Sequence, residues 1–238
     1  MLRDLQGDGL PAGLSADASV DIVVGLPSYR NAATIGSVIQ STLESIRKHY
    51  AGLSFLIVNA DAESPDATAE VVEQFRSRGE AVVCLTNPLP LVDRLRHPFH
   101  GRVGRGTGTQ RILEAAHQLD ARACILLDPA QPGITPGWFD CLLRPVLHGD
   151  YDFVAPDYHR RSYEGTLVSG FVYPLTRALY GVRLRQPVGA DFGLSNRFVA
   201  RLLDRDDWET DLTRFSVDLW MSTIAVAEGF RVCQTYLG

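Results

Sequence analysis

A single acidic residue, Asp128, ends an apolar run in the stretch ILLDPAQPGITPGW, residues 125–138. Chains that hold a metal–nucleotide complex at a strand end usually offer two acids there, spaced Asp-x-Asp, because a hard divalent cation prefers oxygen ligands. Here the second position is Ala130, and Pro129 stands between the two. The stretch therefore allows two readings, a metal site with one carboxylate ligand or a strand that ends in a turn.

Closely spaced glycines fill the segment GRVGRGTGTQ, residues 101–110, and Arg102, Arg105 and Arg111 add positive charge. Glycines let backbone N–H groups approach an anion, and the N-terminus of the helix predicted over 111–121 also favours a phosphate. A surface loop is the alternative. The spacing fits neither a Rossmann motif nor a P-loop. A sugar nucleotidyltransferase ranks lowest, because its glycine loop follows the first strand and this one follows the third.

The stretch NADAESPDAT, residues 59–68, places Asp61 directly after a predicted strand. An Asp at that position can accept hydrogen bonds from a base or a ribose. Ser64 and Asp66 make the same stretch suitable for a helix-capping turn, with Ser64 as the helix start. Both readings of Asp61 stay open on the residues alone.

Two later loops carry further polar groups. PDYHRRSYEGT, residues 156–166, has two adjacent arginines that could bind a carboxylate or a phosphate bidentately, or could be part of a solvated charged loop. QPVGADFGLS, residues 186–195, looks loop-like and places Asp191 between two glycines. Asp191 is either a base or hydroxyl-orienting carboxylate, or a polar turn residue.

Strand-like and helix-like segments alternate along the chain, which predicts a mostly parallel sheet covered by helices. In such sheets ligands bind at the carboxyl ends of the strands. Pro27, Asp61, the glycine segment and Asp128 all fall at those ends. The predicted strands are 20–29, 53–60, 81–87, 123–128, 151–156 and 230–238, and the helices are 34–50, the later part of 61–79, 111–121, 137–149, 167–181 with a bend at Pro174, and 216–229.

The composition is that of an ordinary globular protein. The 238 residues fit one large domain, with 45% hydrophobic and 21% charged residues. A net charge of -5 argues against a general nucleic-acid binder. The four cysteines lie far apart without a C-x-x-C pair, so neither a zinc site nor a disulfide framework is indicated, and three of them suit buried thiols in a reducing cytosol.

The first nineteen residues are rich in glycine and alanine and lack the apolar core of a signal peptide. We expect residues 1–19 to be a flexible leader and 20–238 a single domain. A helix needs about 18 consecutive apolar residues to span a bilayer, and no run in the sequence reaches that length. We therefore expect a cytoplasmic protein without a membrane span.

Taken in order, these segments resemble the family-2-like GT-A glycosyltransferases, above all the glucosylglycerate, mannosylglycerate and glucosyl-3-phosphoglycerate synthases. NADAESPDAT stands in place of the family's D-G-G-S-x-D-G-T turn, and LLDPAQPGITPGW falls at its D-x-D motif. The remaining matches are VGLPSYRNAATI at the first strand, GRGTG (104–108) at the G-K-G loop, and APDYHRRSYEGTLVSGFVYPLTRALYG with RQPVGADFGLS at the acceptor-side loop, helix and G-G-D-F-G segment.

The resemblance implies an α/β chain of the GT-A fold, with a mostly parallel central sheet flanked by helices. It implies a hexosyltransferase that moves a hexosyl unit, with retention, from a UDP- or GDP-sugar to a small hydroxy acid such as glycerate or 3-phosphoglycerate. Mg²⁺ or Mn²⁺ would bridge the diphosphate and neutralise charge on the leaving group. A homodimer is compatible with this reading.

The family's motifs also imply roles for individual residues. Asp128 would bind the metal, and Asp191 would be the catalytic residue near the sugar or the acceptor hydroxyl. The acceptor's carboxylate would be held by Arg160 or Arg161 together with Thr166. The nucleotide would be bound by Pro27, Ser28, Tyr29, Asp61, Gly104, Arg105 and Gly106.

The departures from the family motifs concentrate on the nucleotide and metal side. Ala62, Glu63 and Ala67 stand where glycines are usual, and Ala130 replaces the second acid. The family also places a metal-ligating His just beyond the point where this sequence stops, so we expect a C-terminal segment to be missing. The alternative function is a catalytically impaired binding or regulatory module with a degenerate metal site.

Overall fold

The computed structural model describes residues 19–88, 104–131, 133–159 and 165–237. Seven strands form one sheet in the order β3-β2-β1-β4-β6-β5-β7. Its pairs are parallel except for β4 with β6 and β6 with β5, so the predicted mostly parallel sheet is confirmed. The strands are β1 (Ile22–Ser28), β2 (Phe55–Asp61), β3 (Val82–Thr86), β4 (Ala123–Leu126), β5 (Phe153–Asp157), β6 (Phe192–Ser195) and β7 (Val232–Tyr236).

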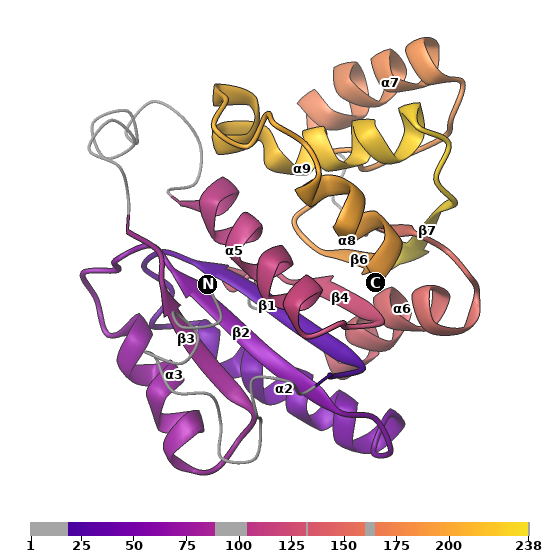
Figure 1. Cartoon of the computed structure of the whole chain (residues 1–238). Coiled ribbons are helices and arrows are strands. Elements are labelled where there is room, and N and C mark those ends of the chain that lie inside the picture. The colour runs from indigo at the N-terminus through magenta and orange to yellow at the C-terminus, as the bar shows by residue number, and fades with distance from the viewer. Residues whose placement is uncertain (1–18, 89–103, 132, 160–164, 238) are drawn as a thin grey trace.

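Helices cover both faces of the sheet (Figure 1). The first face carries α2 (Ile35–His49), α3 (Thr68–Ser77) and α6 (Pro136–His148), and the opposite face carries α5 (Arg105–Gln118), α8 (Asn196–Leu203) and α9 (Asp211–Ala227). A π-helix η2 (Val168–Val172) leads into α7 (Tyr173–Tyr180), with Pro174 in the first turn of α7. Within the described ranges, none of the helices combines the length and apolar character needed to cross a bilayer.

Alternating strand residues feed two hydrophobic cores, as a sheet buried on both faces requires. Val23, Leu56 and Val83 belong to the core under α5, α8 and α9. Ile22, Ile57 and the side chains of α2, α3 and α6 form the other core. The central strands are therefore held from both sides, and the loops at their carboxyl ends start from fixed positions.

Three sequence predictions of local structure were wrong. The segment 186–195 is not only a loop, because its last four residues form the antiparallel strand β6. The helix expected over 111–121 begins at Arg105, so most of the glycine segment that the structure describes is helical. In addition, Ser64 does not start a helix, because α3 begins at Thr68 with Ala67 as its N-cap.

Gly106 has a packing role that explains why the glycine segment can be helical. A Cβ atom there would lie 2.2 Å from the Thr213 carbonyl oxygen, so α5 can approach α9 closely only with glycine at this position. Gly108 lies against Pro27 and Ala60 in a similar but looser way, with 3.3 Å to the Pro27 Cβ. These glycines serve helix packing rather than an open anion-binding loop.

We expect Gly106→Ala to lower the free energy of unfolding by roughly 1–3 kcal/mol, the usual cost of overpacking a close contact. Urea denaturation monitored by circular dichroism measures this change. Gly52→Ala is the matched control, because a Cβ at Gly52 would meet nothing within 4 Å. Equal stabilities of the two variants would show that α5 and α9 can move apart at little cost.

Candidate functional site

The candidate site lies where the sheet changes its direction of winding. The strands β1, β2 and β3 follow one another outward on one side, and β4 pairs with the opposite edge of β1. Open α/β sheets bind ligands at the carboxyl ends of the strands next to such a switch point. Because β6 is antiparallel and pairs Leu126 with Phe192, the residue before β6 meets the residues that follow β4.

This antiparallel pairing brings Asp191 to Asp128. The Asp128 amide donates a hydrogen bond to Asp191 Oδ1 at 2.8 Å, and the Tyr158 hydroxyl donates to Asp191 Oδ2 at 2.5 Å. Tyr158 follows β5, and its hydroxyl oxygen accepts a bond from the Ala190 amide at 3.2 Å. Asp128 and Asp191 are both buried. Three strand ends therefore converge on one carboxyl group.

Burial sets the ionisation of this group. It raises the pKa of Asp191 to about 6, while the hydrogen bonds from Tyr158 and the Asp128 amide pull the pKa down and the Asp128 charge pushes it up. Burial, followed by the charge of Asp191, raises the pKa of the Tyr158 hydroxyl well above its ordinary value. Tyr158 therefore stays protonated at neutral pH and continues to donate its hydrogen bond.

A buried ion pair forms the second part of the site. Arg105 contacts Asp218 through Nε at 3.0 Å to Oδ2 and through one η nitrogen at 2.9 Å to Oδ1. The same η nitrogen donates to the Ala190 carbonyl at 2.8 Å. Burial lowers the pKa of Arg105, but the charge of Asp218, its hydrogen bonds and the charges of Asp128 and Asp191 raise the pKa by more. The pKa therefore lies above its ordinary value, and the guanidinium remains charged.

Three carboxyl groups act on the Arg105 guanidinium. The charges of Asp218, Asp128 and Asp191 each raise the pKa of Arg105. The acidic groups of this part of the chain therefore keep Arg105 charged although it is buried.

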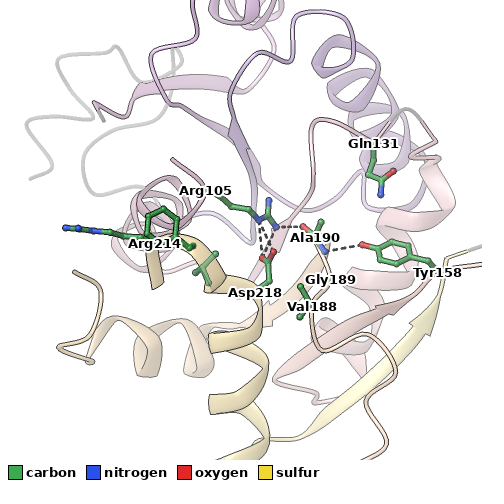
Figure 2. Close-up of a pocket in the computed structure, with 10 residues that line it drawn as sticks. Arg105, Gln131, Tyr158, Val188, Gly189, Ala190, Arg214 and Asp218 are labelled. Carbon is green, nitrogen blue, oxygen red and sulfur yellow. Dashed lines mark hydrogen bonds and ion pairs between the residues drawn. The ribbon is translucent and has the colours of Figure 1, made fainter. Parts of the chain in front are cut away.

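A cavity of about 240 Å³ opens beside the ion pair. Figure 2 shows Arg105 and Asp218 pointing toward each other, with Ala190 and Tyr158 along one wall and the side chain of Arg214 extending away. The break in α9 at Ser216, with φ -137° and ψ 34°, lies among the lining residues. The cavity is lined by Arg105, Gln131, Tyr158, Val188, Gly189, Ala190, Arg214, Phe215, Val217 and Asp218.

Four of the residues predicted to bind a nucleotide, Pro27, Ser28, Tyr29 and Asp61, lie at the ends of β1 and β2 and outside this lining. Ser28 and Asp61 are register partners, and the Ser28 hydroxyl donates to Asp61 Oδ1 at 2.9 Å. Ser64 donates to the same carboxylate from its hydroxyl at 2.6 Å and from its amide at 2.8 Å. Asp61 therefore organises the turn after β2 but does not cap α3, whose N-cap is Ala67. Nucleotide binding by Asp61 stays a prediction. Pro27 precedes Ser28 in β1, and Tyr29 follows the strand.

The glycine segment contributes differently from the sequence prediction. Gly104 is the N-cap of α5 in the left-handed region, with φ 65°, and Asn87 donates from Nδ2 to its carbonyl oxygen at 3.2 Å. The Arg105 side chain is committed to Asp218 and Ala190, and Gly106 packs against α9. The prediction of an open anion-binding loop at Gly104, Arg105 and Gly106 was therefore wrong, because these residues form the start of α5. Nucleotide binding by these residues stays a prediction.

The acceptor-side prediction falls partly outside the described residues. Arg160 and Arg161 belong to the range that the structure does not describe. Thr166 is exposed at the start of the helix that leads into η2, and it does not line the cavity.

Sequence reasoning missed two residues that line the cavity, Tyr158 and Asp218. Tyr158 stood inside the arginine-bearing loop but was given no role. Asp218 had a usable signal, because it is the single acidic residue within the apolar run VDLWM of the last predicted helix. A lone carboxylate on an apolar helix face requires a buried partner, which the structure identifies as Arg105.

The predicted metal ligand Asp128 is in place, but its ligand set is small. Its Oδ1 accepts a hydrogen bond from the Ala130 amide at 3.0 Å, in the manner of a turn. Among the described residues, no group of three or more His, Cys, Asp or Glu side chains could hold a metal ion. The position of Asp128 at a strand end and its carboxylate oxygens fit a hard divalent cation, but the described side chains alone do not complete a coordination shell.

Solved structures of other proteins share the fold of this chain. The chain matches no family model. Glucosyl-3-phosphoglycerate synthase from Mycobacterium tuberculosis, solved with Mn²⁺, UDP and glucosyl-3-phosphoglycerate, has a TM-score of 0.62 at 22% identity, over 95% of this chain and 75% of that one. Mannosyl-3-phosphoglycerate synthase from Rubrobacter xylanophilus has a TM-score of 0.61 at 20% identity, over 92% of this chain and 66% of that one.

One curated relative adds sequence similarity. Glycosyltransferase AglD from Haloferax volcanii is 30% identical over 108 residues, which are 44% of this chain and 15% of that protein. The chain therefore corresponds to a small part of this relative's length. Together with the solved structures, the topology identifies the fold as that of the GT-A glycosyltransferases, which confirms the predicted fold class.

Proposed function

We propose that the protein is a hexosyltransferase that moves a hexosyl unit from a nucleotide-diphosphate sugar to a small hydroxy acid such as glycerate or 3-phosphoglycerate. The observation that carries this proposal is the junction of Asp128 and Asp191 at the switch point of a GT-A sheet. Asp191 is a buried carboxyl group next to Asp128, and its neighbour Ala190 lines the cavity. Such a group is suited to orienting a hydroxyl group of a sugar or an acceptor. The fold comparison supports this reaction class.

The donor nucleotide would lie over the ends of β1 and β2. Pro27, Ser28 and Tyr29 form one side of that surface and Asp61 the other, with the base and ribose of a UDP- or GDP-sugar between them. The diphosphate would approach Gly104–Gly106 at the start of α5, where the helix N-terminus favours negative charge. Arg105, although paired with Asp218, contributes positive charge to the same end of the cavity.

Mg²⁺ or Mn²⁺ would enter together with the diphosphate. Asp128 supplies one carboxylate ligand, and phosphate oxygens and water would supply the others, as Mg²⁺ commonly accepts. The cation would neutralise charge on the departing diphosphate. The proximity of the Asp128 and Asp191 carboxyl groups supports this assignment, because hard divalent cations prefer oxygen ligands.

On the acceptor side, Asp191 would orient the reacting hydroxyl group or the sugar, held in place by Tyr158 and the Asp128 amide. Arg160 or Arg161, with Thr166, would hold the acceptor's carboxylate. Related solved structures contain UDP-glucose with phosphoglyceric acid and with glycerol 3-phosphate, which supports an acceptor of this size and charge. We further propose that the enzyme acts in the cytoplasm.

A catalytically impaired binding module is the second candidate. Two observations favour it, the single carboxylate ligand at Asp128 and the left-handed backbone at Glu63, with φ 51°, where the family has glycine. Such a module would retain nucleotide binding and lose transfer.

A transfer assay separates the two candidates. Purified protein is incubated with UDP-glucose or GDP-mannose, Mn²⁺, and either glycerate or 3-phosphoglycerate, and products are detected by mass spectrometry. Formation of a glycosylated acid supports the enzyme. Nucleotide binding by calorimetry without any transfer product supports the module, and failure of both would overturn the proposal.

A further inference from the structure

One helical segment exposes an apolar stripe along its length. Leu167 is 69% exposed, Phe171 60%, Leu175 44% and Leu179 65%. They recur every four residues through η2 and α7, so they lie along one side of the helix. Figure 1 shows α7 above α9, on the side of α9 away from the sheet. The exposed fractions of the four side chains place the stripe on the surface of the protein.

The segment 166–180 is anchored weakly to the rest of the protein. Thr176 is its only buried residue, and Val168, Val172 and Tyr173 are half-buried. Isolated helices of this length are marginally stable in water, so a helix needs packing of an apolar face to stay folded. Here most of the apolar face is turned outward. A contiguous exposed patch of this kind marks an interaction surface.

The part of the sequence that carries the stripe contains basic residues and no acidic ones. Arg177, Arg183 and Arg185 are exposed, and the sequence from Gly165 to Ala190 contains no Asp or Glu. Arg177 is on α7, and Arg183 and Arg185 follow it in the segment that lies beside β7. The whole chain, by contrast, has a net charge of -5. An apolar partner with negative charge at its boundary would complement this segment.

A second copy of the chain fits this surface less well than a lipid bilayer does. Stable protein–protein interfaces use about 20–30 residues a side, and the stripe consists of four large side chains. A bilayer interface, in contrast, accepts a single helix whose apolar face enters the boundary between headgroups and acyl chains by about 5–10 Å. Basic residues next to that face add attraction to anionic lipids.

We propose that the helix 166–180 docks on the surface of an anionic lipid bilayer. Leu167, Phe171, Leu175 and Leu179 enter the acyl boundary, and the three arginines face the headgroups. This attachment is peripheral, because no described helix is suited to cross the bilayer. The proposal rests on the exposed surface and is independent of the proposed transfer reaction.

Vesicle flotation tests this inference with the full chain. Vesicles of phosphatidylcholine are compared with vesicles that also contain phosphatidylglycerol. We expect binding to the anionic vesicles only, with loss of binding when NaCl is raised from about 0.1 M to about 1 M, since the Debye length shrinks from about 10 Å to about 3 Å.

Three variants locate the surface. Phe171→Ser/Leu175→Ser and Arg177→Gln/Arg183→Gln/Arg185→Gln should each weaken vesicle binding about tenfold or more. Leu212→Ser is the matched control, because Leu212 is 50% exposed but lies outside the stripe, and its binding should match the wild type. Circular dichroism confirms that each variant is folded.

Three results would contradict the proposal. In the first, the protein does not bind anionic vesicles, and sedimentation velocity shows a dimer that the variant Phe171→Ser/Leu175→Ser dissociates. The surface would then join two copies of the chain. The second is no vesicle binding by a monomer. Binding that Leu212→Ser weakens as much as the stripe variants would also contradict the assigned surface.

Discussion

Replacing Arg105 with methionine is expected to destabilise the protein by about 3–5 kcal/mol, the usual cost of removing one partner of a buried ion pair. The variant Arg105→Met leaves Asp218 without its partner, next to the buried carboxylates of Asp128 and Asp191. It also removes the hydrogen bond to the Ala190 carbonyl. Urea denaturation at neutral pH measures the loss.

A double variant shows whether charge is the cause. Arg105→Met/Asp218→Leu removes both charges, so it should recover a large part of the lost stability, because apolar replacement of a whole buried pair is often neutral. Arg47→Met is the matched control, because Arg47 pairs with Glu80 at 57% side-chain exposure, and it should change stability by about 1 kcal/mol or less. If Arg105→Met were as stable as the wild type, Asp218 would have to be solvated or protonated in that variant.

Replacing Asp191 with asparagine is expected to lower the rate of hexosyl transfer by about 10²–10⁴-fold, the range attributed to a positioned acid–base group. Asparagine keeps the size of the side chain and can accept the Asp128 amide, but it removes the negative charge. The measurement is the initial rate of glycosyl-acid formation. Asp204→Asn is the control, because the Asp204 side chain is 82% exposed, and it should leave the rate unchanged.

The stability of Asp191→Asn separates catalysis from folding. Burial raises the pKa of Asp191 to about 6, so the carboxylate costs the folded state free energy once the pH rises through the range from about 4 to about 6. The variant should therefore be more stable than the wild type at pH 8, by about 1–3 kcal/mol, and not at pH 4. A slow variant that is also unstable at pH 8 would contradict this assignment.

The sequence predicted the strand ends well but not the pairing that joins them. The apolar runs 20–29, 53–60 and 123–128 predicted three of the parallel strands, because buried strands leave a continuous apolar pattern. The strand β6 has four residues, one of them glycine, so its pattern was too short to recognise. Without β6, the contact between Asp128 and Asp191 could not be foreseen.

Contacts between residues far apart in the sequence were the second feature that the sequence did not predict. The glycines at 106 and 108 suggested a loop because glycine weakens helices, but tertiary packing against α9 and β1 outweighs that preference. Arg105 was predicted to add positive charge to an anion-binding loop, whereas its partner in the structure, Asp218, is 113 residues away in the sequence. No local pattern reports such a pair.

The central claim is that the carboxyl end of this sheet binds a nucleotide sugar with the help of a cation. Differential scanning fluorimetry with UDP- and GDP-sugars, each with and without Mn²⁺, tests it most directly, because a ligand that binds the native state raises the melting temperature. We expect a rise with at least one of these sugars that is larger when Mn²⁺ is present, and that Asp128→Asn abolishes the effect of Mn²⁺. No rise with any nucleotide sugar, with or without Mn²⁺, would contradict the account.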